Sequence, residues 1–154
     1  MILETRTAET YLGLAVTQMH GVADRLGDDR VNQAPFGAET NSVAVLVTHC
    51  CGVSEFWLGH VGLGRPTSRV RDEEFTATAT VPELHDMLAG MRAQIVADVR
   101  ALDAGEASPA HASLRQTLED ADASDAALVL HVLEELYQHL GHMQVTADAL
   151  AATT

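Results

Sequence analysis

Apolar residues recur at three- and four-residue steps in four separate stretches of the sequence, and no other feature restricts the possible fold as strongly. The first stretch spans residues 12–26 and ends at Gly27. The second follows a run of helix-capping residues at positions 40–42, continues to Trp57 and fades at the glycines before Pro66. Both stretches therefore predict amphipathic helices.

The third and fourth stretches predict two further helices. Thr80 is followed three residues later by Glu83, which is the spacing of a capping box, and Pro82 lies in the first turn, where its missing N–H is tolerated. We expect this helix to end before Gly105. Its expected buried stripe consists of Leu84, Met87, Met91, Ile95, Val99 and Leu102. The fourth stretch spans residues 124–150 and predicts the last helix.

Four such helices, joined without convincing strands, predict an all-α four-helix bundle that forms one domain over residues 1–154. The composition agrees, because apolar residues make up 47% of the chain and aromatic residues only 4%, so aliphatic side chains must fill the core. Two expected connections are long for a bundle, residues 64–79 and residues 104–123. Loop length therefore does not determine the order in which the helices pack.

The charged residues exclude some classes of function. The chain has 22 acidic and 9 basic residues, all of the basic ones arginine, which gives a formal net charge of −13. Phosphate backbones and anionic lipids would repel such a surface, so we expect neither nucleic-acid nor membrane binding. The adjacent Cys50 and Cys51 are expected to be small core residues rather than a disulfide or a nucleophile. With a polar N-terminus and no apolar run near the roughly 20 residues of a membrane span, these features predict a cytoplasmic protein.

Three polar side chains fall on helix faces that are otherwise apolar. At about 100° per residue, Glu135 and His139 share one inward face of the last helix, and Glu134 points outward. His49 lies among apolar residues on the second helix. A buried carboxylate must be paired, protonated or bound to a metal, and two imidazoles with one carboxylate are a sufficient set for a divalent ion. The pattern alone leaves two interpretations open, a metal site or packed polar side chains.

A ferritin-like di-iron site, the other metal centre expected in a four-helix bundle, is excluded by the number of ligands. It requires two Glu-x-x-His units and further glutamates, and the first and third helices supply no such inward-facing set. His142 lies at the rim of the face that carries Glu135 and His139, so it could contact a metal ligand or replace one.

The segments around these candidates resemble a known family. The stretches TNS…LVTH at residues 40–49, RVRDEEF at 69–75 and LEE…HLGH at 133–142 are similar to the DinB-like superfamily, in particular to the branch with mycothiol-dependent maleylpyruvate isomerases and mycothiol S-transferases. The similarity extends over nearly the whole chain, although only the two histidine-bearing segments are specific. It implies a DinB-like four-helix bundle that holds a divalent metal, usually zinc.

Carried over by position, the ligands that the resemblance implies are His49, Glu135 and His139. Many members of the superfamily have histidine where this chain has Glu135, whereas the isomerases have the same His, Glu, His set. The isomerases also have a further C-terminal domain without a counterpart in this sequence, so the resemblance implies a single-domain S-transferase instead.

In such an S-transferase, a low-molecular-weight thiol, mycothiol by resemblance, would be ionised by the metal and attack a small electrophile. Arg65, Arg69 and Arg71 could hold an acidic thiol or substrate at the mouth of the site, or pair with the acidic residues 72–74. The resemblance also implies a homodimer. Two alternatives stay open: a metal- or small-ligand-binding bundle without enzymatic activity, and a metal-assisted hydrolase that needs no added thiol.

Overall fold

The computed structural model describes residues 3–37, 40–115 and 124–152. Its long helices are α1 (Thr5–Leu26), α2 (Val43–Ser54), α4 (Val81–Asp103) and α6 (Asp125–Ala152). A π-helical segment, η1 (Glu55–Gly62), continues α2, and the connections hold α3 (Arg71–Glu74), the 3-10 turn η2 (Pro109–His111) and α5 (Ala112–Arg115). The described residues contain no strand, which confirms the all-α fold. Within these residues, no helix combines the length and the apolar character needed to span a membrane.

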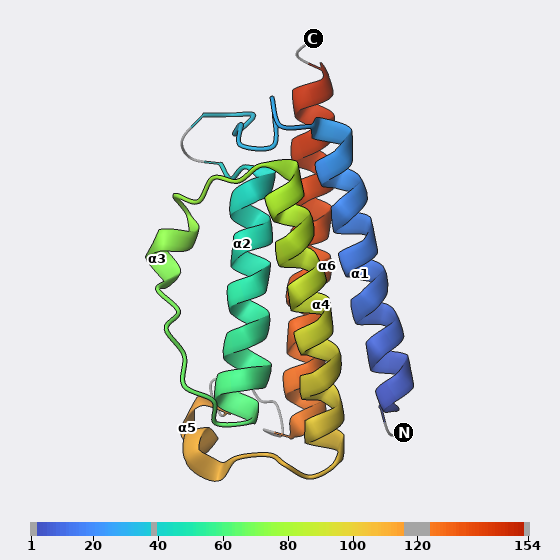
Figure 1. Cartoon of the computed structure of the whole chain (residues 1–154), viewed down its shortest axis with the longest axis vertical. Helices are drawn as coiled ribbons and strands as arrows, with labels where there is room; N and C mark the ends of the chain where they lie inside the picture. Colours follow the sequence, from blue (N-terminus) through green and yellow to red (C-terminus); the bar gives the residue numbers. More distant parts are fainter. Residues whose placement is uncertain (1–2, 38–39, 116–123, 153–154) are drawn as a thin grey trace.

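The four long helices form a bundle in which α1 and α6 run in one direction and α2 and α4 in the other (Figure 1). α4 and α6 both pack against α1, and the same two helices flank α2. Between α2 and α4 the chain returns along the outside of the bundle through a segment that we call the crossover, residues 65–79 (Figure 1). The crossover explains the long connection expected at residues 64–79, since it allows α2 and α4 to be parallel neighbours.

α2 and α4 begin, and α1 ends, where the capping residues predict, whereas α1 begins at Thr5, before the first apolar stretch, and has no side-chain cap. The Ser42 side chain accepts a hydrogen bond from Val45 N at the start of α2 (3.2 Å). At the start of α4, Thr80 and Glu83 form both halves of a capping box. Gly27 follows α1 with a φ of 66°, a conformation that glycine adopts without strain.

The helix faces that the sequence predicts to be buried form the core, with one exception in α4. Leu88 is completely buried, whereas Met87, which the predicted stripe includes, is only half-buried. Steps of three and four residues both keep side chains on one helix face, so the next core residue after Leu84 can be either Met87 or Leu88. The position of α2 beside α4 selects Leu88 and leaves Met87 at the gap between the two helices. Met87 is therefore packed against the edge of the core instead of being fully buried in it.

Gly59 and Gly62, two of the glycines that follow α2, lie in the wider π-helical turns of η1. The Leu63 N–H donates to Leu58 O, five residues earlier (3.1 Å). A Cβ at Gly59 would collide with the guanidinium of Arg65, so this glycine allows the crossover to leave close to η1. Arg65 then donates to both carboxylate oxygens of Asp98 on α4 (2.5 and 2.7 Å). This ion pair, in which only the Asp98 carboxylate is buried, attaches the start of the crossover to the bundle.

Candidate metal centre

Three side chains that could bind a metal ion converge between α2 and α6. His49 projects from α2, and Glu135 and His139 project from adjacent turns of α6. One ligand atom of each residue lies within 4.8 Å of those of the other two. His139 Nε2 lies 3.2 Å from Glu135 Oε2, and His49 Nε2 lies 4.0 Å from the same oxygen. The structure thus brings together the three residues that the sequence singles out, and that they bind a metal stays a prediction.

The register of α6 determines which of two adjacent glutamates faces the site. The side chain of Glu135 is 25% exposed and that of Glu134 is 61% exposed. Glu134 accepts a hydrogen bond from Gln138 on the outer face of the helix (2.9 Å). Since adjacent residues of a helix differ by about 100° in direction, only one of the two can join His139, four residues further on.

The protonation states of the site suit a metal. Burial lowers the pKa of His49 below its ordinary value, although the hydrogen bond to Glu74 acts in the opposite direction. The hydrogen bond from His139 lowers the pKa of Glu135 and outweighs the effect of burial. At neutral pH these shifts favour a neutral imidazole and an ionised carboxylate, which are the forms that bind a divalent ion.

A second carboxylate, Glu74 at the end of α3, holds the ring of His49. His49 Nδ1 donates to Glu74 Oε2 (2.7 Å), and this leaves Nε2 as the ring nitrogen with a free lone pair toward Glu135 and His139. Arg69 donates through Nε to Glu74 Oε1 (2.5 Å) and through its terminal nitrogen to Oε2 (3.0 Å). Burial alone would raise the pKa of Glu74, but the hydrogen bonds from Arg69 and His49 outweigh it and lower the pKa. Glu74 is therefore an ionised, buried acceptor for His49.

Sequence reasoning placed Glu74 only as an alternative partner for the arginines and missed its contact with His49. Gly52 explains how the crossover comes so close to α2, because a Cβ there would collide with Glu74 Oε1 and Arg69 Nε. A glycine inside a helix costs about 1 kcal/mol relative to alanine. A glycine one turn after a candidate ligand was therefore a signal that another segment packs there, but it does not say which one.

The three arginines that the sequence offers for substrate binding have different surroundings. Arg65 pairs with Asp98, an acidic residue that sequence reasoning did not consider, and Arg69 pairs with Glu74. The guanidinium of Arg71 lies over the ring of Phe75, 5.1 Å from its centroid, and is exposed. The ring of Phe75 lies 5.6 Å from that of His49. Of the three arginines, Arg71 is therefore the one beside the site that has no ion pair with the residues that the structure describes.

Two other histidines of α6 differ in their distance from the site. His142 is exposed, and its ring nitrogens are not among the ligand atoms that converge in the described part of the chain. His131, one turn before Glu135, is closer, since its Nε2 lies 3.7 Å from Glu135 Oε1 and its ring packs edge-on against Trp57. The structure therefore places His131 and Glu74, rather than His142, beside the three converging residues.

The sequence matches a family of known proteins over most of its length. A model of the family described as Mycothiol-S-transferase matches residues 7–151, a range that contains His49, Glu135 and His139. No curated protein and no solved structure matches the chain.

Proposed function

Because the chain belongs to the mycothiol S-transferase family, we propose that it is a metal-dependent enzyme that joins the sulfur of mycothiol to a small electrophile. The observation that carries this proposal is the convergence of ligand atoms from His49, Glu135 and His139 within 4.8 Å. Two imidazoles and one carboxylate suit zinc, and three protein ligands leave a coordination position open for a substrate.

A divalent ion held by these residues would lower the pKa of a thiol bound to it, so that the thiol is ionised at neutral pH. The chain's own contribution is to present the ligands in the correct protonation state and orientation. Glu74 holds Nδ1 of His49, which directs Nε2 toward the ligand position, and Arg69 in turn holds Glu74. Such supporting hydrogen bonds keep a metal-binding imidazole in one tautomer and one ring orientation.

The protonation state of the two cysteines favours a nucleophile that comes from outside the chain. Burial raises the pKa of Cys51 to about 12 and that of Cys50 well above its ordinary value. Both side chains are therefore protonated at neutral pH, and a thiol is a much weaker nucleophile than a thiolate. The attacking sulfur is expected to come from the cosubstrate: its S–H proton is lost to solvent, the sulfur bonds to the electrophilic carbon, and the leaving group departs.

Arg71 is the residue we propose for binding an anionic cosubstrate or substrate. Arg65 and Arg69 each donate to both oxygens of a carboxylate, so their charges are already neutralised. Arg71 is exposed above Phe75 at the edge of the site, where a guanidinium can bind a carboxylate of an incoming molecule.

The proposal is tested by following conjugation of 1-chloro-2,4-dinitrobenzene, a generic haloaromatic electrophile, in the presence and absence of mycothiol and zinc. We expect a rate above the uncatalysed one only when both are present. Glu135→Gln should lower this rate at least about 100-fold by removing a charged ligand, whereas the adjacent Glu134→Gln, which changes an exposed carboxylate, should stay within about twofold of the unmodified chain.

Three outcomes would contradict the proposal. Turnover of the electrophile with metal but without any thiol would indicate metal-assisted hydrolysis. A protein that binds zinc but gives no turnover with mycothiol and a range of electrophiles would be a metal-binding bundle. Equal loss of activity in both glutamate variants would show that Glu135 has no special role in the site.

Replacing Glu74 by glutamine tests the hydrogen bond that holds His49. An amide is uncharged and a weaker acceptor than a carboxylate, so we expect the zinc affinity to fall about 10- to 100-fold while the three ligands stay in place. Competition with a chromophoric chelator measures this affinity. Glu73→Gln, at an exposed neighbouring position, is the matched control. Unchanged affinity in Glu74→Gln would mean that His49 is oriented without Glu74.

A further inference from the structure

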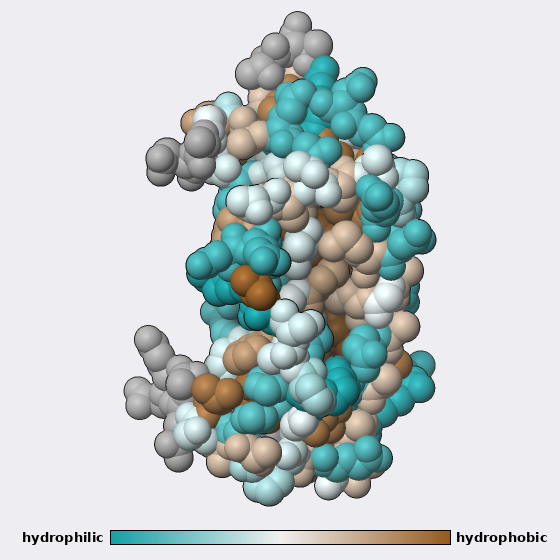
Figure 2. Space-filling view, turned by 60° about the vertical axis from the view of Figure 1, so that its left-hand side comes forward, coloured by the Kyte–Doolittle hydropathy of each residue, from teal (hydrophilic) through white to brown (hydrophobic). Residues whose placement is uncertain are grey.

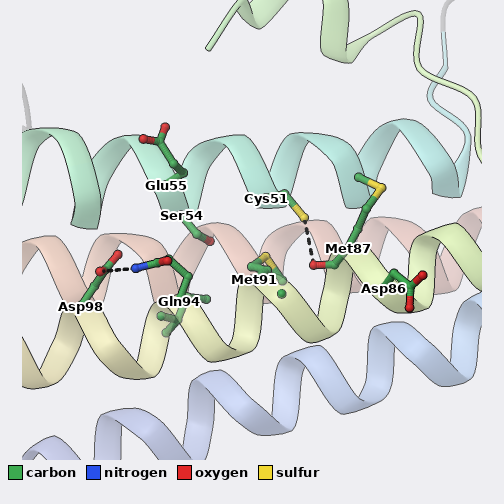
Figure 3. A pocket seen from close by; sticks show the side chains of 10 residues that line it. Cys51, Ser54, Glu55, Asp86, Met87, Met91, Gln94 and Asp98 are labelled. Carbon is green, nitrogen blue, oxygen red and sulfur yellow. Dashed lines mark hydrogen bonds between the residues drawn. The ribbon is translucent and has the colours of Figure 1, made fainter. Parts of the chain in front are cut away.

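A groove of about 320 Å³ lies between the parallel helices α2 and α4 (Figure 3). α4 forms one wall, and the C-terminal half of α2 with the start of η1 forms the other. In the space-filling view of this side, pale and tan residues gather in a band beside the hydrophilic surface (Figure 2). A volume of this size is at the lower end of the range found for small-molecule sites, roughly 300–1,000 Å³.

The groove is separate from the candidate metal centre. His49 faces α6, where it meets Glu135 and His139, and none of these three residues lines the groove. Cys51, two residues after His49, does line it, because two residues along a helix turn the side chain by about 200°. The two sites therefore lie on opposite sides of α2.

The middle of the groove is apolar and adaptable. Met87, Met91 and Ile95 line the α4 wall of the groove, and Cys51 lies on the α2 wall. The Cys51 thiol makes a long contact with Met87 O (3.9 Å; Figure 3). Methionine side chains are flexible and polarisable, so they can adjust to the shape of an apolar ligand. Gly90, between the two methionines, adds no side chain to the groove, and a Cβ there would meet no atom within 4 Å.

All the charged residues among the groove's lining are acidic. Asp98, at one end, is already neutralised, since Arg65 donates to both of its oxygens and Gln94 Nε2 donates to Oδ1 (2.8 Å). The carboxylate of Glu55 accepts from Thr67 Oγ1 (2.8 Å) and points away from α4 (Figure 3). Asp86, at the rim of the other end, is exposed, and its carboxylate lies on the side of α4 that is turned away from α2 (Figure 3). It forms no hydrogen bond or ion pair with the described residues, so its charge is available at this rim.

We propose that this groove binds a small amphiphilic cation, an apolar body with one ammonium group. The body would lie on Met87, Met91 and Ile95, and the ammonium would pair with Asp86. About 13 Å of helix separates Asp86 from Ile95, so an extended chain of several carbon atoms fits along the α4 wall. An anionic ligand is disfavoured, because none of the described residues that line the groove is basic and the chain carries a formal net charge of −13.

Three ligands with alkyl chains of equal length separate the contribution of the charge to the affinity from that of the apolar body: hexylammonium, hexan-1-ol and hexanoate. Each is titrated into the full chain with ¹³C-labelled methionine methyl groups. Met87 and Met91 report on the groove, and the fully buried Met19 and Met143 report on the core. We expect hexylammonium to shift only the signals of Met87 and Met91, and to bind about fivefold more tightly than hexan-1-ol, with hexanoate weakest.

Two variants test the contacts. Asp86→Asn should bring the affinity for hexylammonium down to that for hexan-1-ol without changing the latter. Gly90→Leu should weaken both about tenfold by filling the groove, and Gly21→Leu, at an exposed glycine of α1 with equally open space, should have no effect. The proposal is overturned if hexanoate binds as tightly as hexylammonium, or if the Asp86→Asn variant still prefers the cation. It is also overturned if no methionine signal shifts, or if the signals of Met19 and Met143 shift together with those of Met87 and Met91.

Discussion

Replacing His139 by alanine is expected to lower the zinc affinity of this protein by more than about 100-fold. Loss of a hydrogen bond to a metal ligand already costs about 10- to 100-fold in affinity, and loss of a ligand must cost more. His139 Nε2 lies 3.2 Å from Glu135 Oε2, and its removal would leave only His49 and Glu135 of the three proposed ligands. Elemental analysis of protein purified without chelator should find about one ion per chain before the change and little after it.

His142→Ala is the matched control for this experiment. It removes an imidazole from the same helix, three residues further on, at an exposed position. We expect its metal content to equal that of the unmodified chain, because the structure does not bring His142 to the three converging residues. Full occupancy in His139→Ala, or equal losses in the two variants, would show that the ligand assignment is wrong.

Removing metal with EDTA at pH 7.5 is expected to lower the melting temperature by about 5–10 °C. An ion that binds only the folded state stabilises it by RT ln(1 + [L]/Kd), which is about 2.7 kcal/mol at a hundredfold excess over Kd. For a domain of about 150 residues, each kcal/mol shifts the melting temperature by about 2–4 °C. The helix content should survive, because the apolar core does not include the three converging residues. Thermal melts followed by circular dichroism measure both quantities.

At pH 5 the same treatment should have little effect. Burial lowers the pKa of His49 below about 6.5, the ordinary pKa of histidine. The imidazole of the metal-free protein is therefore neutral above about pH 6.5, and protons compete with the metal for it only at lower pH. The pKa of Glu135 is also lowered, so its contribution is lost only below about pH 4.5. Stabilisation by metal is therefore complete at pH 7.5 and declines as the pH falls through the pKa of His49. Identical melts with and without EDTA at pH 7.5 would favour packed histidines without a metal.

The sequence by itself determined the helices and the spacing of the candidate ligands, because both depend on interactions within a few residues. Thr80 and Glu83 form their capping box within one turn of α4, and Gly27 ends α1 through its own backbone conformation. Glu135 and His139 share a face because they are four residues apart, whatever the helix packs against. The prediction that His49 joins them needed only one further assumption, that its apolar helix face turns to the core.

Only the tertiary structure decided how these elements combine, since the remaining contacts join residues that the local sequence does not relate. The crossover makes α2 and α4 parallel neighbours, and their packing selected Leu88 over Met87 for the core. Glu74 and His49 are 25 residues apart in the sequence, and Arg65 and Asp98 are 33 residues apart. No helical period therefore predicts either contact. Burial of charged groups at such distances depends on the path of the whole chain, and the alternation of polar and apolar residues does not encode that path.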